Sequence, residues 1–236
     1  MRKLTKTLFL ITVFLLIVTG IAFAECKQPV QLSAEQSQEL STFFSRFSVA
    51  FLQPFANGQL TDDAMVRFAL IQLKIDRGYR GLKRWDASHW AASAAEVDRL
   101  TTEFFGKVVT SHQSVQYHPF TDGYYLSPYA TGEVVLFSRI QDLYDNGDGT
   151  FVATVWVYYR DNTINWKGGQ YASITANEDG TFTATEIHVD PDGTTRTLEI
   201  SRIRLSAEYK AIIKPVYEND NKRFLLLEYL QTRGFQ

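Results

Sequence analysis

The chain has 236 residues, of which 45% are hydrophobic, and its 24 basic residues nearly balance its 26 acidic ones. This balance argues against a general nucleic-acid binder, and the length suffices for a well-packed core. With only 6 Pro and 14 Gly, the composition is also not that of a disordered chain.

Residues 1–24 have the pattern of a secretory signal. Three basic residues within positions 2–6 precede an apolar run over 8–18, and small residues follow at 22 and 24. We therefore expect cleavage after Ala24 and an exported protein, periplasmic or extracellular, with no membrane span once the signal is removed. Without these three basic residues, 21 basic residues stand against 26 acidic ones, which is a net charge of −5.

Cys26 is the only cysteine of the chain and lies two residues after this cleavage site. Glu25 separates it from the small residues, whereas a lipid-anchoring motif places the cysteine directly after one. We therefore expect a soluble exported protein without an internal disulfide, stabilised by its core alone.

Residues 33–108 are predicted to form three helices that pack on a sheet, after an extended lead-in over 25–32. Ser33, Thr61 and Ser93 are typical N-cap residues, and the first and third also have Gln or Glu three positions later. The first helix has apolar, mainly aromatic residues at helical spacing, namely Leu40, Phe43, Phe44, Phe47 and Phe51. Three such helices need a flat partner to bury their apolar faces.

Residues 109–236 are predicted to supply that partner as an antiparallel meander of about six to eight strands. Asp-Gly-Thr turns recur at 148–150, 179–181 and 192–194, between segments rich in β-branched and aromatic residues. A register change near Ser201 predicts a β-bulge. Helices first and strands afterwards indicate an α+β fold with a curled sheet, in one compact domain over 33–236.

This element order resembles the cystatin-like and nuclear-transport-factor-like architectures over roughly residues 33–230. It is also similar to that of exported bacterial proteins, among them small inhibitors of cell-wall endopeptidases. The resemblance implies a curled sheet wrapped on helices, and it assigns a function to no residue of this chain.

Catalytic patterns are sparse. The four histidines lack the helical i, i+4 pairing typical of zinc sites. His118 lies four residues before Asp122, and His188 two residues after Glu186, so either pair has the residue types of a base and its orienting carboxylate. We assign no catalytic residue on spacing alone.

Cofactor and metal signatures are also missing from the sequence. The loop over 145–149, Asp-Asn-Gly-Asp-Gly, resembles part of a calcium loop but lacks the alternating oxygen ligands and the closing Glu. Hairpin formation explains it equally well, because the same Asp-Gly-Thr turn recurs twice. We expect neither a metal nor a cofactor.

Two stretches have the residue types of a binding site. The first is a basic aromatic segment over 77–85, whose charged and aromatic members are Arg77, Tyr79, Arg80, Lys83, Arg84 and Trp85. Guanidinium groups bind carboxylates or phosphates and aromatic faces stack on sugars or cations, so an anionic envelope polymer or an acidic envelope protein would suit it. The alternative is a solvated loop whose tryptophans enter the core.

The second stretch is the sheet face that carries Trp156 and Tyr158, with Tyr124, Tyr125 and Trp166 as further candidates. In a curled sheet such a face lines a pocket or a docking surface, unless the helices cover it.

The sequence favours a non-enzymatic envelope protein that binds a partner or ligand through its sheet or its basic aromatic segment. A cell-wall or glycan hydrolase using His or paired carboxylates is the alternative, and an inhibitor of a cell-wall peptidase is the third hypothesis. The hydrolase requires a cleft where a His and a carboxylate meet, and the inhibitor requires a protruding loop or an exposed apolar patch.

Overall fold

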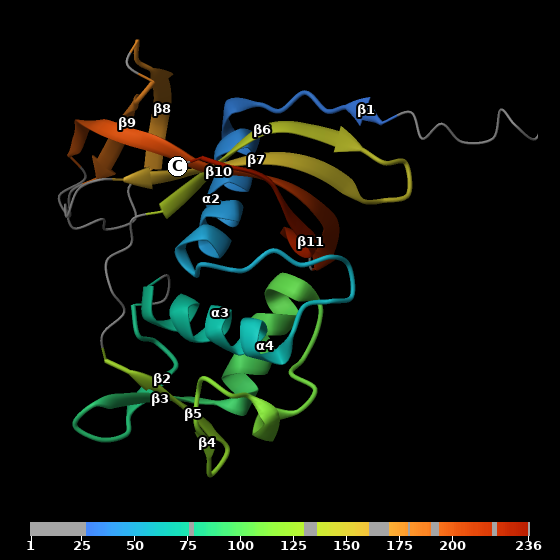
Figure 1. Ribbon diagram of the computed structural model, residues 1–236, viewed down its shortest axis with the longest axis vertical. Helices are drawn as coiled ribbons and strands as arrows, with labels where there is room; N and C mark the ends of the chain where they lie inside the picture. The colour runs from blue at the N-terminus through green and yellow to red at the C-terminus, as the bar shows by residue number, and fades with distance from the viewer. Residues whose placement is uncertain are drawn as a thin grey trace, which may run out of the picture.

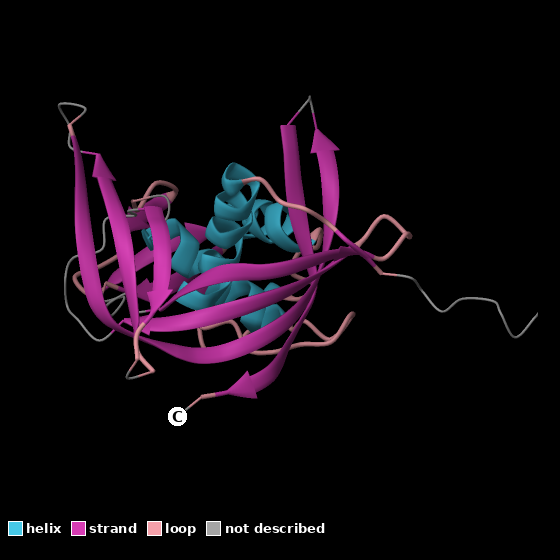
Figure 2. Ribbon diagram, turned by 90° about the horizontal axis from the view of Figure 1, so that it is seen from above, coloured by secondary structure: helices cyan, strands magenta, loops and turns pink. Residues whose placement is uncertain are grey.

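The computed structural model describes residues 27–75, 78–129, 136–160, 170–178, 180–189, 194–218 and 221–235. The predicted signal, Cys26 and residues 192–193 of the third Asp-Gly-Thr turn lie outside these residues. The described part is an α+β fold in which a curled antiparallel sheet encloses three helices (Figures 1 and 2). Within it, no helix is both long enough and apolar enough to cross a membrane.

The large sheet has seven strands in the order β1-β6-β7-β10-β9-β8, with β11 paired to β10. Their bounds are β1 Gln28–Pro29, β6 Leu136–Asp145, β7 Phe151–Arg160, β8 Gln170–Ala176, β9 Phe182–Val189, β10 Thr195–Glu218 and β11 Asn221–Gly234. The 24-residue β10 pairs with β9 through its first part and with β11 through its last, while β7 lies along its other edge. The register shift between Ile200 and Ile203 confirms the bulge predicted near Ser201.

A second, four-stranded sheet lies on the opposite side of the helices (Figure 1). It has the order β2-β3-β5-β4, with β2 Leu82–Arg84, β3 His89–Ser93, β4 Phe120–Thr121 and β5 Tyr124–Pro128, so β2 is an edge strand. We expected all helices to precede the strands, but β2 and β3 lie between the second and third helices. Strands of three and five residues are too short to show a periodicity.

The helices are α2 Ala34–Val49, α3 Asp62–Ile75 and α4 Ala94–Phe105, and a short 3-10 turn, η1, spans His112–Ser114. The predicted caps are confirmed. Ser33 and Gln36 form a reciprocal capping box, the Thr61 hydroxyl accepts from the Ala64 N–H, and Ser93 caps α4. Gly106 ends α4 with φ of 66°, a conformation that favours glycine.

One core cluster joins both sheets to the helices. Phe47 is fully buried at its centre, where its ring stacks on Phe68 at 5.1 Å and meets Phe43 edge-on at 4.9 Å. The cluster extends to Ala153 and Val155 of the large sheet and to Ala92 and Tyr125 of the small one. The aromatic face predicted for the first helix therefore holds the layers together.

Serines of α2 cover the open edge of β6, since β1 pairs only with the far end of that strand. The Ser45 hydroxyl accepts from the Ser138 N–H at 2.9 Å, and the Ser41 hydroxyl accepts from the Ile140 N–H at 3.2 Å. Ser48 completes the row through a 3.1 Å hydrogen bond from the Ser138 hydroxyl. The helix thus pairs backbone groups that would otherwise form an exposed sheet edge.

Candidate functional site

The basic aromatic segment is not the simple loop between helices of the alternative reading. Its residues 82–84 form β2, and its aromatic residues Tyr79 and Trp85 meet rings of β3 and β5. Alternation along β2 places Lys83 and Arg84 on opposite faces of the small sheet. Each of them lies over an aromatic ring, so two clusters flank the edge strand.

The first cluster contains three aromatic rings in a row. The centroid of Trp90 lies 5.3 Å from that of Tyr79 and 5.1 Å from that of Tyr129. The Arg84 guanidinium lies 5.7 Å from the Tyr129 ring, a cation–π distance. Tyr79 is 38% exposed and the other two rings are half-buried, so the row is anchored on one side and open on the other.

The second cluster lies on the other face. The Lys83 ammonium group is 3.4 Å from the centroid of the Tyr124 ring and 5.1 Å from that of Trp85. The two rings are 5.9 Å apart. Both rings are half-buried, whereas Lys83 itself is exposed.

The acid nearest to these clusters in sequence, Asp86, is occupied by its own turn. Its carboxylate accepts from the N–H groups of Ser88 and His89, at 2.6 and 2.9 Å, and lies 3.0 Å from the His89 Nδ1. These contacts, the Ser88 N–H first, lower the pKa of Asp86. Within the described residues, the ion pair of this carboxylate is with His89 and not with Arg80, Lys83 or Arg84, which are all exposed.

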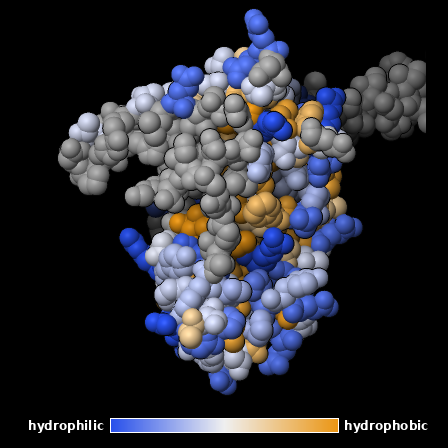
Figure 3. All heavy atoms as spheres, turned by 60° about the vertical axis from the view of Figure 1, so that its left-hand side comes forward, coloured by the Kyte–Doolittle hydropathy of each residue, from blue (hydrophilic) through white to orange (hydrophobic). Residues whose placement is uncertain are grey.

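Arg77 lies outside the described residues. Arg80 is exposed in the turn before β2. Figure 3 shows that the lower part of this face of the molecule is mainly hydrophilic, while apolar residues gather at mid-height. A polar, charged ligand suits the lower part better than an apolar one does.

Trp156 and Tyr158, from the second predicted stretch, lie on one face of β7. The helices cover the other face of this strand, which carries Ala153 and Val155. Tyr158 is nevertheless buried, because its ring stacks on Phe137 at 5.2 Å and meets Phe182 edge-on at 5.3 Å. Burial raises the pKa of Tyr158 to about 12.

Trp156 is half-buried on the same face of β7, and its indole donates to the Glu208 carboxylate at 3.0 Å. Together with the packing of Tyr158, this makes the described part of that face a second small core. Trp166 lies outside the described residues.

Of the two histidine pairs considered from the sequence, His118 with Asp122 lies within the described residues, and this pair does not form. No hydrogen bond joins His118 to Asp122, and burial lowers the pKa of His118. The side chains of Glu186 and His188 lie outside the described residues.

A different array forms instead, and sequence spacing gave no signal for it. The His112 Nδ1 lies 2.6 Å from the Tyr125 hydroxyl, and its Nε2 lies 3.4 Å from the Asp98 carboxylate. Tyr125 is fully buried, and burial raises the pKa of its phenol. Because both ring nitrogens are engaged within the protein, His112 ties η1 to α4 and β5 rather than facing a substrate.

In the calcium-like loop over 145–149, both carboxylates accept hydrogen bonds from backbone groups of the turn. Asp145 accepts from the Gly147 N–H at 2.7 Å, and Asp148 accepts from the Thr150 N–H at 2.9 Å. These carboxylate bonds shape the hairpin between β6 and β7. Across the described residues, no group of three or more His, Cys, Asp or Glu side chains is placed to hold a metal ion.

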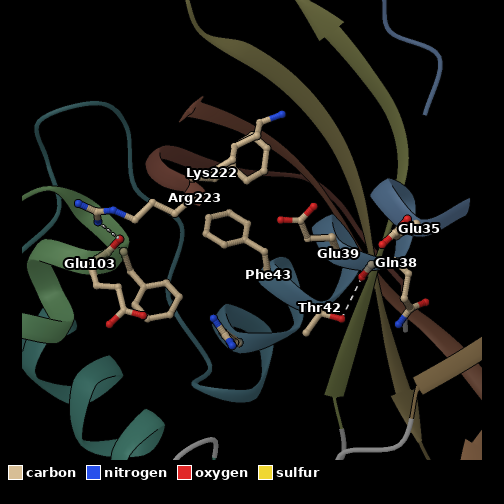
Figure 4. Close-up of a pocket in the computed structure, with 11 residues that line it drawn as sticks. Glu35, Gln38, Glu39, Thr42, Phe43, Glu103, Lys222 and Arg223 are labelled. Atoms are coloured by element: carbon tan, nitrogen blue, oxygen red, sulfur yellow. Dashed lines mark hydrogen bonds between the residues drawn. The ribbon is translucent and has the colours of Figure 1, made fainter. Parts of the chain in front are cut away.

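The structure also contains a groove that the sequence did not indicate, with a volume of about 660 Å³. It lies between α2, the C-terminal turn of α4 and the start of β11 (Figure 4). Its lining residues are Glu35, Gln38, Glu39, Thr42, Phe43, Arg46, Glu103, Phe104, Lys222, Arg223 and Phe224.

Comparison with known protein families finds no match to this chain, and neither curated proteins nor solved structures give one.

Proposed function

We propose that the protein is an exported, non-enzymatic binding protein that holds an anionic sugar polymer of the cell envelope along the edge of its small sheet. The observation that supports this most is the pair of cation–aromatic clusters on either side of β2, with Lys83 and Arg84 seated over aromatic rings. Export rests on the secretory pattern of residues 1–24.

The chemistry of both clusters suits a polymer of charged sugars. Aromatic faces stack on the apolar faces of sugar rings, while guanidinium and ammonium groups attract carboxylates or phosphates. Tyr79, Trp90 and Tyr129 extend over two successive centroid spacings of 5.3 and 5.1 Å, so they offer an extended surface instead of a single closed pocket.

The position at a sheet edge supports the same proposal. Among the strands of the described residues, β2 has only β3 as its neighbour, and both of its faces carry a cation with aromatic rings. A chain-like ligand that crosses the edge reaches both clusters at once. Two weak contacts on one polymer strengthen each other through effective concentration.

Affinity electrophoresis in native gels tests the proposal with residues 25–236 carrying Cys26→Ser. The gels contain polygalacturonate as the anionic sugar polymer, dextran as a neutral one, or polyglutamate as an acidic polymer without sugars. We expect retardation by polygalacturonate, less by polyglutamate and none by dextran. The retardation should weaken with added salt, because exposed charges are screened.

A matched pair of variants locates the site. Arg80→Glu with Arg84→Glu should weaken binding at least about tenfold, since two attractions become repulsions. Lys107→Glu with Lys210→Glu changes the net charge equally at exposed positions elsewhere and should leave binding within about twofold. Tyr79→Ser should weaken binding about threefold or more through the lost ring face.

Other results would overturn the proposal. Equal retardation by polyglutamate and polygalacturonate would indicate an acidic protein partner. Shortening of the polymer during the assay would indicate the hydrolase. An equal loss in both charge variants would show that net charge alone, and not β2, determines binding.

A further inference from the structure

The groove of Figure 4 has a floor of three phenylalanine rings. Phe43 lies between the other two, with its centroid 6.3 Å from that of Phe104 and 6.0 Å from that of Phe224. All three are at least 92% buried, with exposures of 8, 3 and 8% in that order. The floor is therefore fixed by packing against the main core.

Opposite charges lie on the two sides of the Phe43 ring, while Arg46, further along α2, places its guanidinium 5.2 Å from the Phe104 ring. Glu35 and Glu39 lie one helical turn apart on α2, whereas Lys222 and Arg223 lie on β11. In Figure 4 the Phe43 ring lies between the Glu39 carboxylate on one side and the Arg223 side chain on the other.

Several of the charges in the groove already have partners. The Arg223 guanidinium donates to the backbone oxygens of Thr102 and Glu103, at 3.3 and 2.7 Å, and so caps the C-terminus of α4. The Glu103 carboxylate pairs with Arg99 at 3.0 Å. These contacts hold the α4 wall in place.

Three further charges of the lining face the solvent across the groove. Glu35, Glu39 and Lys222 are exposed, and no ion pair joins either carboxylate to Lys222 within the described part of the chain. The Lys222 ammonium lies 4.9 Å from the Phe224 ring, at the edge of the floor. The groove thus presents negative charge, an aromatic floor and positive charge in that order.

We propose that this groove is a second binding site, independent of the small sheet, and that its ligand is a short zwitterionic peptide. An amino group would lie at Glu35 and Glu39, an apolar side chain on Phe43, and a carboxylate at Lys222. The volume of about 660 Å³ is within the range of small-ligand sites. The separation of charge by sign fits a ligand with both charges better than a simple anion or cation.

Isothermal titration with the dipeptide leucyl-phenylalanine tests this site, beside its N-acetylated form and its C-terminal amide. We expect saturable one-to-one binding of the free dipeptide and roughly fivefold weaker binding of each blocked form, because each lacks one charge. Glu39→Gln should weaken the free dipeptide by a similar factor and leave the N-acetylated form unchanged. Lys222→Gln should act in the same way on the carboxylate end.

Two controls separate the site from folding and from the small sheet. Glu178→Gln and Lys107→Gln change the same charges at exposed positions elsewhere and should not alter binding. The Arg80→Glu, Arg84→Glu variant should bind the dipeptide as the parent does, even if the polymer proposal fails. Absence of saturable binding, or equal affinity for all three forms of the peptide, would overturn the inference.

Discussion

The serine row between α2 and β6 gives the sharpest stability prediction. Ser45→Ala removes the acceptor of the Ser138 N–H, and Ser138 is only 2% exposed, so water does not readily replace the lost bond. A buried N–H without a partner costs about 1–3 kcal/mol, and the better helix propensity of alanine offsets about 0.5 kcal/mol. We therefore expect the free energy of unfolding to fall by about 1.5 kcal/mol.

Urea unfolding followed by tryptophan fluorescence measures this loss. With a slope of about 2 kcal/mol per molar urea, the midpoint should fall by roughly 0.75 M. Thr42→Ala is the matched control, because the Thr42 hydroxyl is exposed and bonds only to the Gln38 carbonyl of its own helix. Its effect should stay within about 0.5 kcal/mol. If both variants unfold at the same urea concentration, the serine row does not stabilise the β6 edge.

Three further outcomes follow from single residues. Gly106→Ala should lower the free energy of unfolding by about 1–2 kcal/mol, since φ is 66° and the new Cβ would lie 3.0 Å from Leu225. Gly123→Ala should cost about 1 kcal/mol, because its new Cβ meets nothing within 4 Å. Urea midpoints that reverse this order would contradict the prediction. The raised pKa of Tyr158, about 12, means that the folded state holds this proton more tightly than the unfolded chain, so its contribution to stability is complete below pH 10 and is lost as the pH rises from about 10 to 12. Absorbance titration at alkaline pH should therefore lose one late-titrating tyrosine in Tyr158→Phe, while the late titration of Tyr125 stays, and loss of an early-titrating tyrosine would refute the burial argument. Asp62→Asn should speed amide exchange over 110–111, whose N–H groups both donate to this carboxylate, and unchanged exchange would show that other contacts hold the segment.

Local signals in the sequence predicted much of the fold. The N-caps at Ser33 and Ser93 and the glycine C-cap at 106 depend on backbone groups within a few residues, so they could be recognised without tertiary information. The β6–β7 and β8–β9 hairpins were predicted for the same reason.

Features that depend on distant contacts were missed. β2 and β3 are short, and their sheet forms only when β5 pairs with β3 from more than 30 positions later in the chain. His112 meets Asp98 and Tyr125 only after α4 and β5 pack together. The groove was missed because α2 and β11 are about 180 residues apart in the sequence. The resemblance to cystatin-like architectures remains a prediction.

The candidate site was predicted in part. The composition of residues 77–85 indicated a basic aromatic site, and the structure brings its residues next to rings from β3 and β5 that the sequence did not join to them. For Trp156 and Tyr158 the sequence indicated a pocket or a docking surface, and in the structure Tyr158 packs against Phe137 and Phe182. An amphipathic strand pattern alone does not distinguish a pocket lining from a second core.

Hydrogen–deuterium exchange with and without bound polygalacturonate tests the central proposal most directly. It predicts that the polymer slows exchange over residues 78–93 and 124–129, the edge of the small sheet and its ring partners, and that the Arg80→Glu, Arg84→Glu variant abolishes this protection. Protection confined to the groove between α2 and β11, or no protection at any residue under saturating polymer, would contradict it.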